Sequence, residues 1–186
     1  MGVAVVGVVR RRDGFVHLAP NLGWKNVPLG ALLGARFGLG DAVMAANEAD
    51  LGALAEFRRG AGVGATQLVY VNSEVGIGAG IIQDGQPMLG AAGYAGEVGH
   101  TLINPDGKPC TCGARGCWET EAGEAALAER AGLTEFVGQQ LIEEITQRVD
   151  DRDPQTLQAL QVTGTWLGYG IGNLINVFNP DAVVIG

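Results

Sequence analysis

One stretch, residues 97–119, holds all three cysteines of the chain and one of its two histidines. Three thiolates and one imidazole form the complete tetrahedral ligand set of a closed structural zinc site. Glycines at positions 113 and 116 would let a short loop fold back on the metal. The sequence therefore predicts a Zn²⁺ site, and its candidate ligands are His100, Cys110, Cys112 and Cys117.

A disulfide with one spare thiol, or three unrelated buried cysteines, is the alternative explanation. An odd number of cysteines leaves one unpaired, and Cys110 and Cys112 are too close in sequence to bridge easily. The N-terminus lacks the pattern of a signal peptide, so we expect a cytoplasmic protein, in which thiols stay reduced and bind metal.

The order of these residues resembles the signature of a known family. Glu-x-Gly-His followed by Cys-x-Cys-Gly-x-x-Gly-Cys-x-Glu is similar to the ROK family of bacterial sugar kinases and sugar-responsive transcriptional repressors. The likeness extends to residues 19–24, 47–50, 76–80 and 179–186. It implies an α/β fold of the actin-like ATPase, or ribonuclease H-like, sugar-kinase type with an inserted structural zinc loop.

The resemblance also implies which side chains contact a sugar. Glu97, His100 and Glu119 would hydrogen-bond the sugar ring while the metal loop keeps them convergent. In this comparison Asn47 and Glu48 would also contact the sugar, with Asn47 binding its hydroxyls, and Asn21 would lie near the same pocket. A sugar-binding function follows from the resemblance, although the identity of the sugar does not.

Four of these polar residues also have a local explanation. Asn21 stands between proline and a Leu-Gly pair, which is typical turn chemistry. Asn47 precedes a predicted helix over 49–59, where it would cap the first turn. Glu48 and Glu119 would each begin a helix, where the helix dipole favours a negative charge.

The segment 47–48 bears on catalysis. Kinases of the family carry Asn-Asp there, and the aspartate is the general base on the hydroxyl that accepts the phosphoryl group. Glu48 keeps the acid type but moves the carboxylate by about 1.5 Å, and a base must lie within hydrogen-bond reach of its proton. Sugar binding could survive where catalysis does not.

The glycine run offers a nucleotide-phosphate site, for ATP with Mg²⁺, at Gly76, Gly78 and Gly80. Backbone amides in such a turn can approach phosphate, whereas glycines inside strands often mark only close packing. Glu74 in the same turn would repel the phosphates. Both Glu48 and Glu74 therefore argue against kinase activity.

We expect the sugar-sensing domain of a ROK repressor that is truncated at both ends and has no kinase activity. The first phosphate strand, any helix-turn-helix and the C-terminal adenosine segment of the family have no counterpart in residues 1–186. An ATP-dependent, glucokinase-like sugar kinase with Glu48 as general base is the alternative. A zinc-stabilised remnant that binds nothing is a third.

Composition limits the partners. With 47% hydrophobic and 17% charged residues over 186 positions, the chain can bury a real core. A net charge of −8 argues against DNA binding by this stretch itself, because neutralising phosphates needs a basic face. DNA would therefore be contacted only by a module outside it. No uninterrupted apolar run reaches membrane-spanning length.

These residues need an α/β framework to position them. We expect a remainder of the N-terminal lobe over 1–46 and a second lobe over 47–186, with the zinc loop at 97–119. Exposed Trp166 and Tyr169 on the long helix 155–178 could form a homodimer face, or they could pack in the core. Hydrophobic periodicity and turn residues predict a small-residue loop over 91–96, a hairpin turn at Asp84 and Gly85, and helices over 29–37, 49–59, 119–131, 134–149 and 155–178. They also predict strands over 3–9, 15–18, 42–46, 67–72, 101–103 and 182–185, and a further strand into which the chain continues through the glycines of 73–82.

Overall fold

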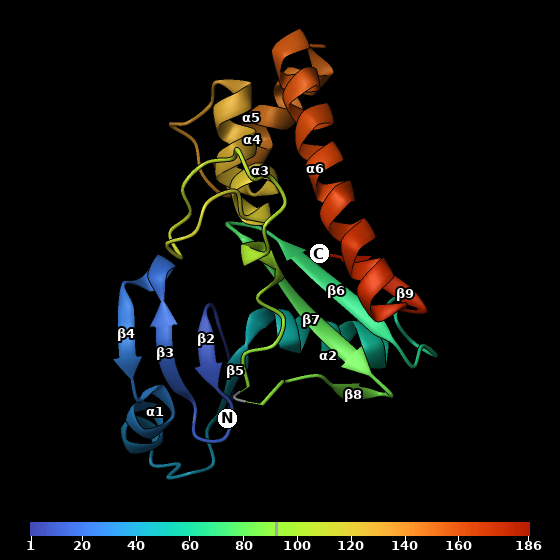
Figure 1. The fold of residues 1–186 in the computed structure, drawn as a ribbon. Coiled ribbons are helices and arrows are strands. Elements are labelled where there is room, and N and C mark those ends of the chain that lie inside the picture. Colours follow the sequence, from blue (N-terminus) through green and yellow to red (C-terminus); the bar gives the residue numbers. More distant parts are fainter. Residues whose placement is uncertain (92) are drawn as a thin grey trace. The chain divides into compact units, whose positions relative to one another are not determined.

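The computed structural model is α/β, as expected, and describes residues 1–91 and 93–186 (Figure 1). Residue 92, inside the predicted loop over 91–96, lies outside the described residues. Unit 1 comprises Met1–Tyr70 and Gly80–Gly96, and unit 2 comprises Val71–Ala79 and Glu97–Gly186. The predicted lobe boundary after residue 46 stays a prediction.

Unit 1 begins with two small sheets. Strand β1 (Gly2–Val5) pairs in parallel with β5 (Met44–Asn47), and β2 (Val8–Arg10), β3 (Phe15–Ala19) and β4 (Trp24–Val27) form an antiparallel sheet in that order.

The single strand predicted over 3–9 is wrong, because the chain bends at Gly7. This residue has a φ of +93°, and a Cβ there would lie 2.3 Å from the Leu18 carbonyl oxygen. Only glycine tolerates both the left-handed backbone and this close approach.

Apolar side chains from β1, β2, β3, β5 and α1 (Leu29–Phe37) form the first core of unit 1. Its buried members are Val5, Val9, Val16, Ala19, Leu29 and Ala45. A 3-10 turn, η1 (Pro20–Leu22), leads into β4, and helix α2 (Glu48–Arg59) follows β5 directly. The helices predicted over 29–37 and 49–59 are confirmed within one residue.

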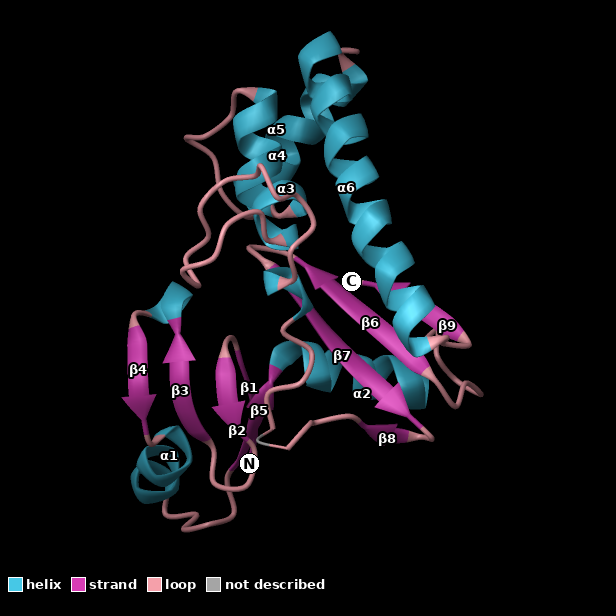
Figure 2. Ribbon diagram, in the orientation of Figure 1, coloured by secondary structure: helices cyan, strands magenta, loops and turns pink. Residues whose placement is uncertain are grey.

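A four-stranded sheet has the order β8-β7-β6-β9 (Figure 2). Its strands are β6 (Leu68–Ser73), β7 (Ile77–Gln83), β8 (Gln86–Pro87) and β9 (Ala182–Ile185). The predicted hairpin turn at Asp84 and Gly85 is confirmed. Both residues have positive φ, +51° and +74°, as a two-residue type I′ turn requires.

Unit 2 is mainly helical. Its elements are η2 (Val98–His100), α3 (Trp118–Ala122), α4 (Glu124–Ala131), α5 (Gln139–Asp150) and α6 (Pro154–Phe178). The long helix predicted over 155–178 is confirmed, and Asp153 caps it by accepting from the Thr156 backbone N–H at 2.8 Å. No helix in the described part of the chain is both long and apolar enough to cross a membrane.

Three predicted elements of unit 2 need correction. The helix over 119–131 is interrupted at Gly123, whose extended backbone separates α3 from α4. The helix over 134–149 begins only at residue 139, because Gly138 before it has a φ of +55°. The strand over 101–103 is reduced to one isolated bridge between Leu102 and Cys117.

Candidate functional site

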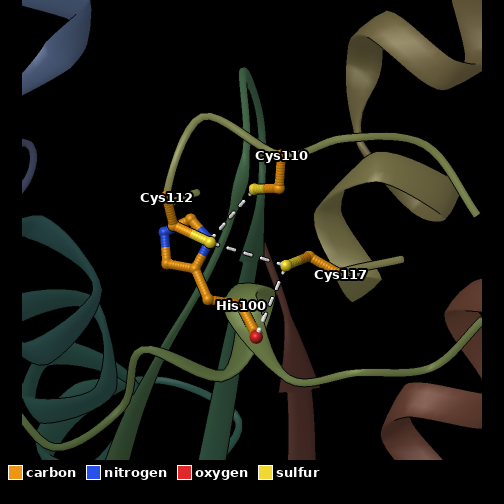
Figure 3. Close-up of side chains that lie close together, drawn as sticks. All are labelled: His100, Cys110, Cys112 and Cys117. Carbon is orange, nitrogen blue, oxygen red and sulfur yellow. Dashed lines mark hydrogen bonds between the residues drawn. The ribbon is translucent and has the colours of Figure 1, made fainter. Parts of the chain in front are cut away.

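The four predicted metal ligands converge in unit 2. Their ligand atoms all lie within 4.8 Å of one another, and Figure 3 shows the side chains facing a common centre. The sulfur atoms of Cys112 and Cys117 are 3.7 Å apart, and the Cys110 sulfur lies 3.5 Å from His100 Nδ1. A tetrahedral zinc ion requires edges of about 3.8 Å between two sulfurs and about 3.6 Å between sulfur and nitrogen. The spacing therefore fits a zinc ion.

Short-range contacts shape the loop that carries the thiols. The Cys110 N–H donates to the Ala114 carbonyl at 2.8 Å, and the Gly113 N–H donates back to the Cys110 carbonyl at 3.0 Å. Gly113 and Gly116 have φ values of +93° and +69°. The prediction that glycines at these positions let the loop fold back is confirmed.

The chemistry of the donors also fits a cation. All three cysteines are free thiols, so the structure contains no disulfide among them. Burial and the neighbouring thiols of Cys110 and Cys112 raise the pKa of Cys117 to about 12. By contrast, a hydrogen bond from the Ala114 backbone lowers the pKa of the exposed Cys112. A bound dication supplies the positive charge that three adjacent thiolates need.

Trp118 anchors the end of the metal loop to α6. Its indole is fully buried, and its Nε1 donates to the Trp166 carbonyl at 3.0 Å. Gly170 makes room for the ring, because a Cβ there would lie 1.9 Å from the indole Cε2. Sequence analysis missed this pair, although a glycine inside an apolar helix is a signal of close packing. Since Trp118 stands between Cys117 and Glu119, anchoring its ring also restricts the positions of these two neighbours.

Glu119 reaches back from α3 to strand β7. Its Oε2 accepts from the Ile77 backbone N–H at 3.3 Å. Gly76 permits the approach, since a Cβ there would lie 2.2 Å from the same oxygen. The carboxylate is thus held in one place while its other oxygen can still accept hydrogen bonds.

Glu97 and His100 belong to the same electrostatic neighbourhood as Glu119. Burial among protein atoms raises the pKa of Glu97, the His100 charge opposes the rise, and the Glu119 charge adds to it. Glu97 is nevertheless exposed, so solvent reaches part of its side chain. The structure therefore brings together three of the predicted sugar contacts within unit 2.

The other predicted contacts belong to unit 1. Asn47 caps α2, with its Oδ1 accepting from the N–H groups of Ala49 at 2.8 Å and Asp50 at 3.3 Å. Its Nδ2 donates to the Gly7 carbonyl at 2.9 Å. The capping explanation is confirmed, and the amide keeps a second N–H for a ligand. Glu48, the first residue of α2, is half-buried.

Asn21 lies exposed in η1, with Pro20 at the first helical position and Gly23 closing the turn at a φ of +65°. The turn explanation is therefore confirmed for this residue. A sugar contact by Asn21 stays a prediction.

Packing explains Gly80, another member of the predicted phosphate run. A Cβ at Gly80 would lie 2.3 Å from the Ala49 carbonyl oxygen, so glycine lets β7 and α2 approach closely. Gly78 is half-buried in β7, and Glu74 is exposed in the turn before the strand. Phosphate binding by Gly76, Gly78 and Gly80 stays a prediction.

Comparison with known proteins settles the family. The ROK family model matches residues 1–186. The chain belongs to the ROK family. This ROK chain is 40% identical over 198 residues to a putative xylose repressor of Caldicellulosiruptor sp. (strain Rt8B.4), and the match covers 100% of the chain but 49% of the repressor. The chain spans about half the length of the xylose repressors it matches.

Two solved structures have the same fold as this ROK chain. A ROK family glucokinase from Streptomyces griseus, in complex with glucose and AMPPNP, superposes with a TM-score of 0.88 at 30% identity, covering 100% of this chain and 64% of the glucokinase. A ROK family transcriptional regulator, a homologue of the E. coli MLC protein, gives 0.85 at 34% identity, covering 100% and 48%. The predicted actin-like sugar-kinase fold is confirmed, and both branches of the family share it.

Proposed function

We propose that this chain is the sugar-sensing domain of a ROK transcriptional repressor, held in shape by one zinc ion and without kinase activity. The observation that carries the proposal is the four-ligand cluster in the same unit as Glu97 and Glu119, on either side of the loop. The putative xylose repressor, at 40% identity, supports the regulatory branch. A cytoplasmic location, where thiols stay reduced, is part of the proposal.

The zinc ion would hold the side chains of Glu97, His100 and Glu119 at fixed positions relative to one another, so that all three can contact the sugar. His100 would bind zinc through Nδ1, the nitrogen that faces Cys110, and leave Nε2 for a sugar hydroxyl. Glu119 is separated from Cys117 only by the buried Trp118, and Glu97 lies one turn before His100. Zinc would act as a structural cross-link of the loop.

Carboxylates and an imidazole suit a polyhydroxylated ligand. Glu97 and Glu119 accept hydrogen bonds from hydroxyl groups, and their charge makes those bonds stronger than neutral ones. Asn47 and Glu48 at the start of α2, together with Asn21, are the proposed contacts from unit 1. Because DNA binding needs a basic face and this chain carries a net charge of −8, DNA contacts would come from a module outside these residues.

Two side chains support sensing over phosphoryl transfer. Glu48 is one methylene longer than the aspartate expected of a general base, and a displaced base loses contact with its proton. Glu74 adds an exposed negative charge in the turn between β6 and β7, where the family's kinases are expected to approach phosphate.

A thermal-shift titration of the zinc-loaded chain tests the proposal. D-xylose and D-glucose are the first probes, with mannitol as a polyol that has no ring. A sugar present at 100 times its dissociation constant would stabilise the fold by about 2.7 kcal/mol. At about 2–4 °C per kcal/mol, the expected rise in the unfolding midpoint is about 5–10 °C, without any nucleotide.

Variants locate the binding. Glu97→Gln and Glu119→Gln are expected to abolish the sugar-dependent rise, whereas Glu135→Gln, at an exposed site on the same unit, leaves it unchanged. A flat response of the wild-type chain to every sugar would contradict sugar sensing. One zinc ion per chain by elemental analysis is the expected metal content, and a metal-free purified chain that cannot be loaded would contradict the zinc centre.

A sugar kinase is the second candidate, favoured by the likeness to the glucokinase structure with glucose and AMPPNP. In that case Glu48 would be the general base, and ATP with Mg²⁺ would lie near the glycine run at 76–80. Coupled ADP release in the presence of sugar, lost in Glu48→Gln, would establish this activity and overturn the non-catalytic assignment. The sensor proposal expects no sugar-dependent ADP release.

A further inference from the structure

Glu121 on α3 is a buried carboxylate that the sugar site does not use. Only 6% of its surface is exposed, and no other charged residue in the described part of the chain is as buried. A carboxylate in such a place needs partners for both oxygens, because an unpaired buried charge is costly. The Glu121 carboxylate has hydrogen-bond partners on two other segments of unit 2, the metal loop and α4.

The first partner is on the metal loop. Asn104 Nδ2 donates to Glu121 Oε1 at 2.9 Å. The backbone N–H of Asn104 donates in turn to the Gly116 carbonyl at 3.1 Å, one residue before the ligand Cys117. Gly107 leaves room for this contact, since a Cβ there would lie only 2.5 Å from Glu121 Oε1 and 2.8 Å from the Gly116 Cα. Glu121 thus holds Asn104, and the Asn104 backbone is hydrogen-bonded to the other end of the loop at Gly116.

The second partner is on α4, and it extends the network to α6. Arg130 of α4 donates from Nη2 to Glu121 Oε2 at 3.1 Å and from Nη1 to the Glu121 carbonyl at 2.6 Å. The same Nη1 donates to the hydroxyl of Thr163, a buried residue of α6, at 2.8 Å. One continuous chain of hydrogen bonds therefore runs from the metal loop to α4 and α6.

Stability alone does not account for this arrangement. Buried ion pairs are often replaced by apolar side chains without loss, because desolvation offsets their attraction. A fully satisfied polar network instead selects one arrangement of the segments that it joins. Here the selected arrangement is the position of the loop relative to α3, the helix that directly follows Cys117.

We propose that Glu121 is a positioning residue for the metal centre: through Asn104 it fixes the base of the loop so that the thiols arrive at ligand spacing. The inference rests on the zinc centre of the proposed function. Groups that orient metal ligands without touching the ion typically change metal affinity by about 10–100-fold. We expect about tenfold for Glu121, at the lower end of that range, because it acts through the backbone of the loop.

A double-mutant cycle on the 186-residue chain tests the link. Glu121→Gln keeps the shape, but its amide can accept from only one of Asn104 and Arg130 and turns an N–H₂ group toward the other. Asn104→Asp keeps the turn to Asp106, whose N–H donates to Asn104 Oδ1 at 3.2 Å, but places two carboxylates against each other. In the double variant, the amide at position 121 can donate to the carboxylate at position 104 while its oxygen accepts from Arg130. The net charge of the double variant equals that of the wild type.

Zinc affinity and the rate of zinc release are measured by competition with a chromophoric chelator. Each single variant is expected to raise the zinc dissociation constant about tenfold, and the double variant to return it to within about twofold of wild type. Glu129→Gln is the matched control, because Glu129 pairs with Lys108 of the same loop in an exposed ion pair. Its effect is expected to stay within about twofold.

The outcomes separate this inference from the proposal beneath it. A wild-type chain that binds no zinc overturns the metal centre itself. A wild-type chain that binds zinc, with Glu121→Gln equal to Glu129→Gln, overturns only the positioning role. Equal loss of unfolding midpoint in the metal-free and zinc-loaded forms, at unchanged zinc affinity, would show a purely structural pair. If Glu121→Gln does not fold, Asn104→Asp and the double variant decide, since both keep an acceptor for Arg130.

Discussion

The contact between Trp118 and Gly170 allows a sharp test of how α6 supports the metal loop. Replacing Gly170 by alanine places a Cβ 1.9 Å from the Trp118 Cε2. An ordinary carbon–carbon contact is about 3.5 Å, so the indole or the helix must shift by about 1.6 Å. The fully buried ring has no free space in which to make that shift.

Two opposing effects set the magnitude. Alanine is favoured over glycine in a helix interior by about 1 kcal/mol. Overpacking a buried site costs about 1–3 kcal/mol, and loss of the Trp118 Nε1 hydrogen bond to Trp166 adds about 1 kcal/mol. We therefore expect Gly170→Ala to lower the free energy of unfolding by about 1–3 kcal/mol, a decrease in midpoint of about 2–12 °C.

Gly168 supplies the matched control. It is an exposed residue of the same helix, and a Cβ there meets nothing within 4 Å. Gly168→Ala is expected to raise the unfolding free energy by up to about 1 kcal/mol. Urea unfolding of both variants, followed by circular dichroism and Trp fluorescence, measures the difference. Equal effects of the two substitutions would refute the packing argument, because helix propensity would then account for both.

Three further predictions follow from the described contacts. Removal of zinc with EDTA is expected to lower the midpoint by about 10 °C, with recovery on adding Zn²⁺ but not Mg²⁺, as differential scanning calorimetry would measure. Hydrogen bonds from the Thr156 hydroxyl and N–H lower the pKa of Asp153, so its capping contribution is full above the ordinary carboxyl pKa and is lost as pH falls through the lower folded value. The midpoint gap between wild type and Asp153→Ala should therefore narrow between about pH 5 and pH 3, and a constant gap would contradict the assignment. Asn47→Ala is expected to cost about 1 kcal/mol in urea unfolding through loss of the α2 cap, whereas Asn47→Asp keeps the cap and loses only the donor to Gly7.

Local sequence signals predicted much of the fold. The helix over 154–178 has a long apolar repeat, a capping Asp153 and a terminating Pro180, and it forms as expected. Asp84 and Gly85 form the predicted hairpin turn because their positive φ values suit that pair. Errors occurred where one glycine redirects the chain, as at Gly7 and Gly123, since apolar periodicity does not register a bend.

The four side chains that converge were predictable from residue type and spacing, because the chain holds only three cysteines and two histidines, and four of these five residues lie within 97–119. The contacts that hold these side chains in place were not predictable from the sequence. The sequence does not reveal that Glu121 meets Asn104, seventeen residues earlier, or that Arg130 bridges it to Thr163. Such contacts arise from the packing of α3 against α4 and α6, which pairs residues without any local pattern.

By itself the sequence determined the family, the kinds of secondary structure and the four side chains able to hold a metal. Those features depend on residue chemistry and on short-range backbone preference, which neighbouring residues largely decide. Only the tertiary structure decided that Gly170 receives the Trp118 ring, that Gly76 admits the Glu119 carboxylate, and that a buried Glu121 ties the loop to two helices. The physical reason is that close packing and buried hydrogen bonds join residues distant in sequence, and their geometry exists only once the chain has folded.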